Sequence, residues 1–173
     1  AGAAGAGPGA EAAGEAKAPS YGQGTLWCHL YISPAMLCHG FDLNKKIIGR
    51  GGENTRGIYE ASGAKIRLRG RGSGHAEPHT QVEAKCPLML AITGERRDAA
   101  GFCEGVRLCA ELLRGIERRF REFRGGRGRG AALPGPAFWV GGISALGQRC
   151  AGATIEECGL AGPPPSEVPD APA

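Results

Sequence analysis

An apolar side chain recurs at every second position along three short stretches of the chain, at 25–32, 64–69 and 88–93. A period of two residues is typical of a β-strand that buries one face and exposes the other. In the first stretch the apolar face consists of Leu26, Cys28, Leu30 and Ile32. The pattern therefore predicts three strands, the first of which ends before Pro34.

The longest periodic segment opens at Arg97-Asp98 and repeats an apolar residue every three or four positions. Its members are Ala99, Phe102, Val106, Cys109, Leu113, Ile116, Phe120 and Phe123. One continuous apolar stripe of this kind is typical of a helix that covers a sheet. A coiled coil shows the same spacing, but the glycines within this segment favour a helix packed inside a domain.

Two shorter helices are expected between the first and second strands. Asp42 can cap a helix that starts near Leu43, and a run of glycines stops it. A second helix begins at Glu53 or Asn54 and ends just before Gly63. The order of elements is therefore β-α-α-β-β-α.

The two ends of the chain are rich in Ala, Gly and Pro and hold few periodic apolar positions. Such stretches bury too little apolar surface to offset the entropy lost on ordering. We therefore expect one folded domain at 25–123, a disordered tail at 1–24 and a disordered tail at 124–173. The apolar residues at 137–140 are either a docking peptide for a protein partner or an apolar patch without a function. The sequence leaves both interpretations open.

Basic residues are concentrated in the centre of the chain. Between Thr25 and Gly130, 19 Lys and Arg stand against 11 Asp and Glu, so this part carries +8 while the whole chain carries +4. Eight of the basic residues fall between Lys45 and Arg71. A domain with this charge is suited to a polyanionic partner.

Cysteine usage and hydropathy exclude two other classes of protein. The seven cysteines are odd in number and contain no CxxC pair, so we expect reduced thiols in the nucleus and/or the cytoplasm. No run approaches the ~20 consecutive apolar residues that a membrane span needs, so no membrane partner is expected. The first residues of the sequence hold no basic region followed by an apolar run, so no secretory signal is expected among them.

A glycine-rich, basic turn at 49–52 joins the two short helices. Glycine there allows another molecule to approach the backbone closely. A nucleotide-binding enzyme is the main rival interpretation, but the segment lacks the third Gly of GxGxxG and no Gly-Lys-Ser/Thr follows. Catalytic arrangements and zinc-ligand spacings are absent from the sequence as well. We therefore predict that the protein is not an enzyme and uses no metal and no cofactor.

The segment IIGRGGENTRGIYEASGAKIRL resembles the core of the KH domain, a module that binds single-stranded nucleic acid. The matching residues are Ile47, Ile48, Gly49, Gly52, Ile58, Glu60, Gly63, Ala64 and Ile66. The order of elements resembles the type I arrangement, which implies an α+β fold with a three-stranded antiparallel sheet packed on three helices. The resemblance covers roughly residues 25–120. The continuation GRGSGHAE, with a long loop and a helix containing CEGVRLCAELL, is similar to single-KH proteins linked to pre-mRNA splicing. Thr55 departs from the pattern, because this family usually has an apolar residue there.

The resemblance also implies which residues bind. The GxxG loop of a KH domain clamps the backbone of about four nucleotides. By this resemblance Ile47, Ile48, Ile58, Ile66 and Leu68 form a groove floor for bases, while Lys65, Arg67 and Arg69 contact base edges or the sugar-phosphate chain. The full set of candidate RNA-binding residues is Lys45, Lys46, Ile47, Ile48, Gly49, Arg50, Gly51, Gly52, Asn54, Arg56, Ile58, Lys65, Ile66, Arg67, Leu68 and Arg69.

The expected function is single-stranded RNA binding in pre-mRNA processing or in another post-transcriptional step. Two alternatives stay open: recognition of single-stranded DNA in transcription, and use of the fold as a protein-interaction scaffold. The basic residues in and beside the loop argue against the scaffold. The segment Arg124–Gly130 resembles a short RGG tract, which adds sequence-tolerant affinity, although a solvated linker has the same composition. The sequence does not predict the oligomeric state.

Overall fold

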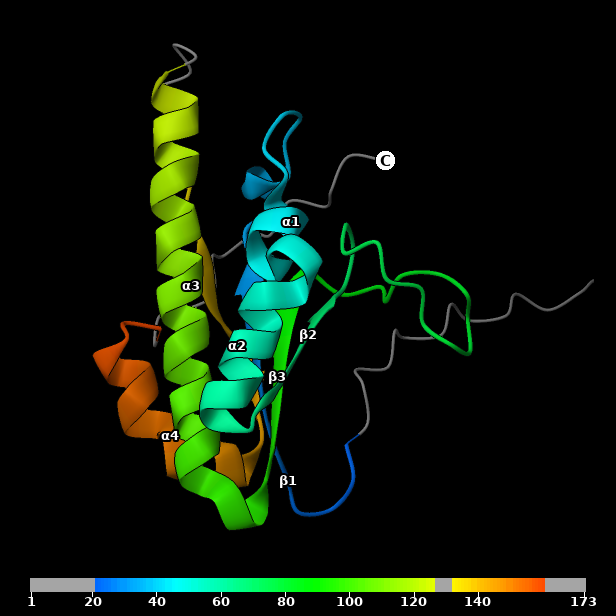
Figure 1. Ribbon diagram of the computed structural model, residues 1–173, viewed down its shortest axis with the longest axis vertical. Helices are drawn as coiled ribbons and strands as arrows, with labels where there is room; N and C mark the ends of the chain where they lie inside the picture. Colours follow the sequence, from blue (N-terminus) through cyan, green and yellow to red (C-terminus); the bar gives the residue numbers. More distant parts are fainter. Residues whose placement is uncertain (1–20, 127–131, 161–173) are drawn as a thin grey trace, which may run out of the picture.

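The computed structural model describes residues 21–126 and 132–160 (Figure 1). In chain order the strands and α-helices are β1 (Thr25–Ile32), α1 (Leu43–Ile48), α2 (Glu53–Ser62), β2 (Lys65–Arg69), β3 (Met89–Glu95), α3 (Ala99–Gly125), β4 (Phe138–Ile143) and α4 (Ala145–Glu157). Three 3-10 turns, η1 (Pro34–Met36), η2 (Arg50–Gly52) and η3 (Arg96–Asp98), connect them. The three predicted strands and three predicted helices are confirmed, and their α+β class with them.

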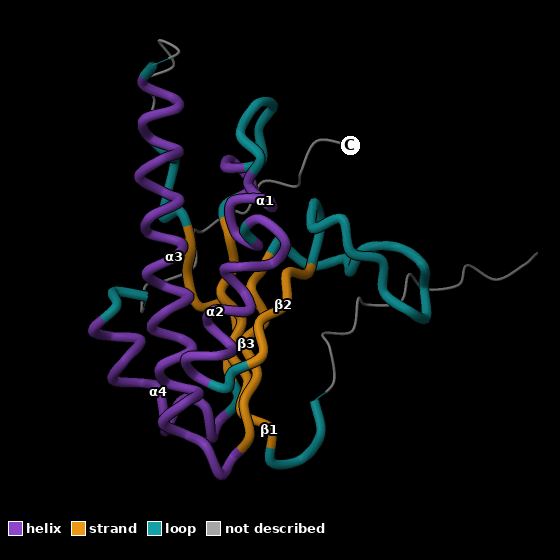
Figure 2. Tube along the Cα trace, viewed as in Figure 1, coloured by secondary structure: helices purple, strands orange, loops and turns teal. Residues whose placement is uncertain are grey.

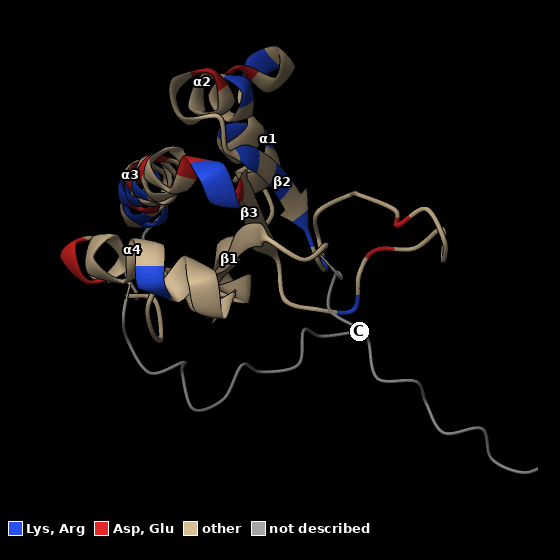
Figure 3. Ribbon diagram, turned by 90° about the horizontal axis from the view of Figure 1, so that it is seen from below, with Lys and Arg blue, Asp and Glu red and all other residues tan. Residues whose placement is uncertain are grey.

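One antiparallel sheet organises the described residues, with the strand order β2-β3-β1-β4. The helices α1, α2 and α3 lie on one side of this sheet (Figures 2 and 3). The side chains of β1 that face the helices are at most 1% exposed, as the alternation predicts. They are Leu26, Cys28, Leu30 and Ile32. The period of the sequence therefore identifies the core face of the sheet correctly.

The apolar stripe of α3 packs against the sheet. This confirms the prediction of a helix packed inside a domain rather than in a coiled coil. Phe102, Val106 and Phe120 are among its fully buried members. Gly105 lies where α3 passes closest to Ala64, because a Cβ on Gly105 would sit 2.5 Å from the Ala64 Cβ. The glycine thus permits a close approach of α3 to the segment that enters β2. None of the helices in the described ranges is long and apolar enough to cross a bilayer.

The prediction of a disordered tail at 124–173 is wrong for residues 132–160, because β4 and α4 form there. β4 pairs with β1 along the edge that β3 leaves free, so the sheet has four strands rather than the predicted three. Ala137, Phe138 and Trp139 are at most 8% exposed. These residues therefore belong to the fold and are not available as a docking peptide.

Pairing with β1 explains why a weak strand signal suffices for β4. The backbone of β1 supplies the hydrogen-bonding partners that a short isolated strand lacks. Gly141 lies against the Tyr31 ring, where an added Cβ would sit 2.2 Å from the ring carbons. The Ser144 hydroxyl then caps α4 by accepting a hydrogen bond from the Gly147 amide at 3.0 Å. Neither contact is visible as a period in the sequence.

The boundaries of the folded domain in the chain extend slightly beyond the predicted residues 25–123. Tyr21 stacks on Trp27 with ring centroids 5.5 Å apart, and its hydroxyl lies 2.8 Å from His29 Nε2. At the other end α3 runs to Gly125, into the predicted RGG tract. Two predictions lie outside the described residues. They are the disorder expected at 1–20 and 161–173, and the remainder of the RGG tract at 127–130.

Candidate nucleic-acid interface

Three glycines shape the turn between α1 and α2. Gly49, Gly51 and Gly52 have φ angles of +80°, +60° and +81°, in the region that favours glycine. A Cβ on Gly49 would lie 2.9 Å from the Asn54 backbone nitrogen, so the first glycine is also required sterically. A Cβ on Gly51 would meet nothing within 4 Å, and this glycine therefore forms the open tip of the loop.

Hydrogen bonds from the first turn of α2 hold the glycine loop in this shape. The Asn54 side-chain amide donates to the Lys46 carbonyl at 2.9 Å and so joins the start of α2 to the last turn of α1. The Thr55 hydroxyl donates to the Gly52 carbonyl at 3.2 Å. Thr55, which departs from the family pattern, thus contributes a polar bond to the loop where an apolar residue would contribute packing.

A hollow of about 690 Å³ opens beside this loop and is strongly basic. Its charged lining residues are Lys45, Lys46, Arg50 and Arg119, with the carboxylates of Asp42 and Glu53. Lys45 pairs with Asp42 at 3.4 Å, but both side chains are more than 60% exposed, so water screens this pair strongly. Four cations against two carboxylates leave a net positive charge at the loop.

Arg119 was missed by the sequence analysis. It belongs to α3 and lies about 70 positions beyond the glycine loop in the chain. An edge-to-face contact between Phe41 and Phe120, with centroids 5.0 Å apart, brings this part of α3 to the start of α1. Because the contact joins two segments that are distant in the chain, the sequence pattern does not place Arg119 at the glycine loop. It shows only that Arg119 lies next to the apolar stripe of the helix.

The N-terminus of α2 adds to the positive potential at the loop. The cap residue Gly52 is left-handed and no side chain caps this helix. A helix N-terminus presents backbone N–H groups and the positive end of the helix dipole, which together favour an anion. The loop, the hollow and the helix end therefore form a site suited to phosphate groups.

The five apolar residues predicted for a groove floor are not equally accessible. Ile47 is completely buried, and Ile58 and Leu68 are each 8% exposed, so these three pack mainly in the core. Ile48 and Ile66 are half-buried at the border of the core. The structure thus leaves Ile48 and Ile66 as the apolar residues of this set that a base can reach most easily. Arg56 is exposed on α2.

The basic side chains of β2 lie on the outer face of the sheet, as the alternation of this strand predicts. Ile66 and Leu68 pair in register with Ile92 and Leu90 of the buried face, so Lys65, Arg67 and Arg69 point to the outer side of the sheet. Arg69 there forms an ion pair with Glu77 at 3.5 Å. The contacts with base edges or the sugar-phosphate chain that the resemblance implies for Lys65, Arg67 and Arg69 stay a prediction, now assigned to this outer face.

The loop between β2 and β3 is held against α1. Glu83 accepts hydrogen bonds from the backbone amides of Gly72 and Gly74, at 2.8 and 2.5 Å. The Asn44 side-chain amide donates to the Gly72 carbonyl at 2.6 Å. These contacts place the beginning of the long loop, with the GRGSG sequence, beside the helix that leads into the glycine loop.

Comparison with known proteins agrees with this geometry. A family model described as KHDC4/BBP-like, KH-domain type I, matches residues 38–114. The chain is also similar to Uncharacterized protein C30D11.14c of Schizosaccharomyces pombe, with 25% identity over 85 residues, which is 49% of this chain and 16% of that protein. The chain therefore spans about a sixth of the length of this relative. Residues 38–114 form a type I KH domain, a module of a nucleic-acid-binding family rather than an enzyme family.

Proposed function

We propose that the protein binds single-stranded RNA through the loop at 49–52 and acts in pre-mRNA processing. The observation that carries this proposal is the open glycine loop at the uncapped N-terminus of α2, beside a hollow lined by four cations. A double helix is too wide and too rigid for a tight turn to clamp. A flexible single strand can bend its backbone to bring successive phosphates against the loop.

In this proposal each part of the site has a separate task. The loop and the N-terminus of α2 hold the phosphates, with Arg50 at the tip. Lys45, Lys46 and Arg119 line the adjacent hollow and attract the strand electrostatically. Bases lie against the half-buried Ile48 and Ile66. The protein carries out no chemical step on the RNA.

One KH domain contacts few nucleotides, so the expected affinity is modest. We expect a Kd in the micromolar range or weaker, comparable with the ~10⁻⁴ to 10⁻⁶ M of non-specific nucleic-acid binding. Selective action in the nucleus or the cytoplasm then needs a second contact, for which the arginine-rich segment after α3 and a protein partner are the two candidates.

The choice between RNA and DNA decides between the proposal and its first alternative. Incubating the full chain with equal amounts of randomised single-stranded RNA and DNA pools, then sequencing the bound fraction, measures this choice directly. We expect RNA to be enriched with a recurring short motif, because a splicing or processing factor must find its site on a transcript.

Two outcomes of the pool experiment count against the proposal. Preferential enrichment of DNA supports the transcription-related alternative. Retention of neither pool, by a chain whose fold is intact by circular dichroism, supports the scaffold alternative. A pool of duplex RNA serves as the matched control, and it is expected to be retained no better than background.

A further inference from the structure

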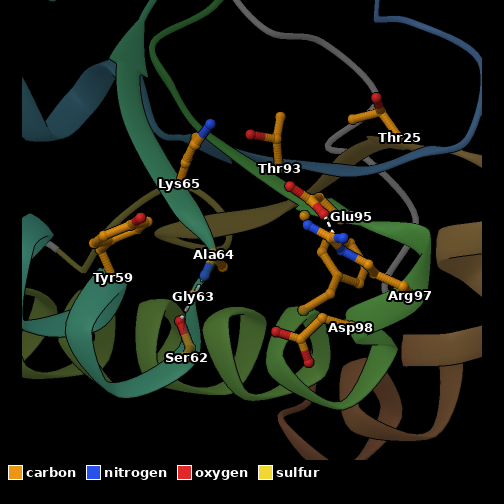
Figure 4. Close-up of a pocket in the computed structure, with 12 residues that line it drawn as sticks. Thr25, Tyr59, Ser62, Gly63, Ala64, Lys65, Thr93, Glu95, Arg97 and Asp98 are labelled. Atoms are coloured by element: carbon orange, nitrogen blue, oxygen red, sulfur yellow. Dashed lines mark hydrogen bonds and ion pairs between the residues drawn. The ribbon is translucent and has the colours of Figure 1, made fainter.

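A second hollow lies at the opposite end of α2 from the glycine loop. It measures about 520 Å³ and is formed where α2 ends, β2 begins and β3 leads into α3. Its volume falls in the range of about 300–1,000 Å³ that is typical of ligand sites. Tyr59 and Lys65 lie on one side of this hollow, and the Glu95–Arg97 ion pair lies on the other (Figure 4).

Tyr59 gives this hollow an aromatic wall. The residue is 49% exposed, and it is one of three large apolar side chains that are exposed among the described residues, with Leu37 and Val82. Leu37 and Val82 lie in loops, whereas Tyr59 stands on a helix that fixes its position. An exposed aromatic ring held in place by secondary structure is suited to stacking of a nucleobase.

Polar groups with spare hydrogen-bonding capacity surround the ring. Within the described ranges the Lys65 ammonium forms no ion pair and the Thr93 hydroxyl forms no hydrogen bond, and both residues line the hollow. The two carboxylates of the hollow are already engaged: Glu95 pairs with Arg97, and Asp98 caps α3 by accepting from the Gly101 amide at 3.0 Å. The two cations and two carboxylates of the hollow balance, and among the described residues Lys65 is the charged group of the hollow that has neither an ion pair nor a capping role.

The distance between the two ends of α2 matches the length of a short strand. A helix of ten residues is about 15 Å long. Four nucleotides, the number that a glycine loop of this kind clamps, extend about 14 Å even at the stacked spacing of about 3.4 Å. A strand gripped at the loop and running along α2 therefore reaches the hollow with the next nucleotide.

We infer that this hollow is a subsite for one further nucleotide of the bound strand, beyond the four held at the loop. Its base stacks on Tyr59 and hydrogen-bonds to the Thr93 hydroxyl, and Lys65 contacts the adjoining phosphate. The inference rests on the proposed function, and it deepens that function by extending the length of strand that the domain recognises.

The length of the bound oligonucleotide tests this subsite. Fluorescence anisotropy would measure the affinity of the full chain, wild type and Tyr59→Ala, for labelled mixed-sequence single-stranded RNA of four and of eight nucleotides. We expect the variant to lose about 5-fold or more in affinity for the longer RNA, as expected for removal of a stacking ring. Its affinity for the shorter RNA should stay unchanged. The longer RNA can bind in several registers, which raises its apparent affinity for the variant and the wild type alike. The ratio of the two affinities at each length is therefore free of this effect.

Tyr59→Phe is the matched control, because it keeps the ring, and it should retain wild-type affinity for both lengths. Equal losses at both lengths in Tyr59→Ala would overturn the subsite, since Tyr59 would then serve the four-nucleotide site, while the proposed function would stand. Unchanged affinity for the longer RNA would overturn it as well. If wild type binds neither RNA, the proposed function and the subsite both fail. Thermal unfolding confirms that the variants fold.

Discussion

Replacing Arg50 and Gly51 together by aspartate is expected to weaken binding of single-stranded RNA by about 100-fold or more. The change removes one cation from the tip of the loop and places two carboxylates where the proposal puts phosphates. Like charges at close range oppose binding, and a factor of 100 corresponds to about 2.8 kcal/mol. Fluorescence anisotropy with an eight-nucleotide RNA measures the loss.

The same substitution should leave the fold intact. Arg50 is exposed, and a Cβ on Gly51 would meet nothing within 4 Å. Aspartate is among the residues that tolerate the left-handed backbone of Gly51. Arg149→Asp with Ala153→Asp, on exposed positions of α4, carries the same change in charge and serves as the control. Equal weakening by the α4 pair would mean that overall charge, and not the loop, governs binding.

Removing β4 and α4 by ending the chain at Gly126 is expected to lower the free energy of unfolding by about 3 kcal/mol or more. Phe138, Trp139 and Ile155 are at most 8% exposed, and full burial of such a side chain contributes about 1.5–3 kcal/mol. The truncation also exposes the edge of β1, which presents unpaired backbone groups to other chains. Urea denaturation followed by circular dichroism measures the loss.

A single substitution in α4 distinguishes the stability lost with side-chain packing from the stability lost by shortening the chain. Ile155→Ala leaves the chain complete and should cost about 2–4 kcal/mol, whereas Ala153→Asp on the exposed side of the same helix should cost little. An unfolding midpoint for the truncated chain equal to that of the full chain would show that β4 and α4 do not stabilise the domain.

The strands and the long helix could be predicted because each buries one face against a core. Leu26 to Ile32 alternates because every second side chain faces the helices, and α3 repeats every three or four residues because its stripe covers the sheet. β4 could not be predicted in the same way. Gly141 and Gly142 interrupt its apolar run, and its stability comes from pairing with β1, more than 100 positions earlier in the chain.

The candidate site was predicted in part for related reasons. The glycine loop is a local motif, so its residues and those of α1 are close together in sequence and in space. Arg119 joins them only through the contact between Phe41 and Phe120. The resemblance implies that Arg67 and Arg69 contact the bound strand, and the alternation of β2 correctly assigns them to the face opposite Ile66 and Leu68.

The central claim is that the loop at 49–52 and the first turn of α2 grip the backbone of a single strand. Titrating the isotope-labelled full chain with an eight-nucleotide single-stranded RNA, while recording backbone amide NMR signals, tests it most directly. We expect the largest shifts at residues 49–55 and little change in β4 and α4. The claim would be contradicted if the amides at 49–55 stayed unchanged while signals of the outer sheet face, such as those of Trp27 and Tyr31, shifted instead.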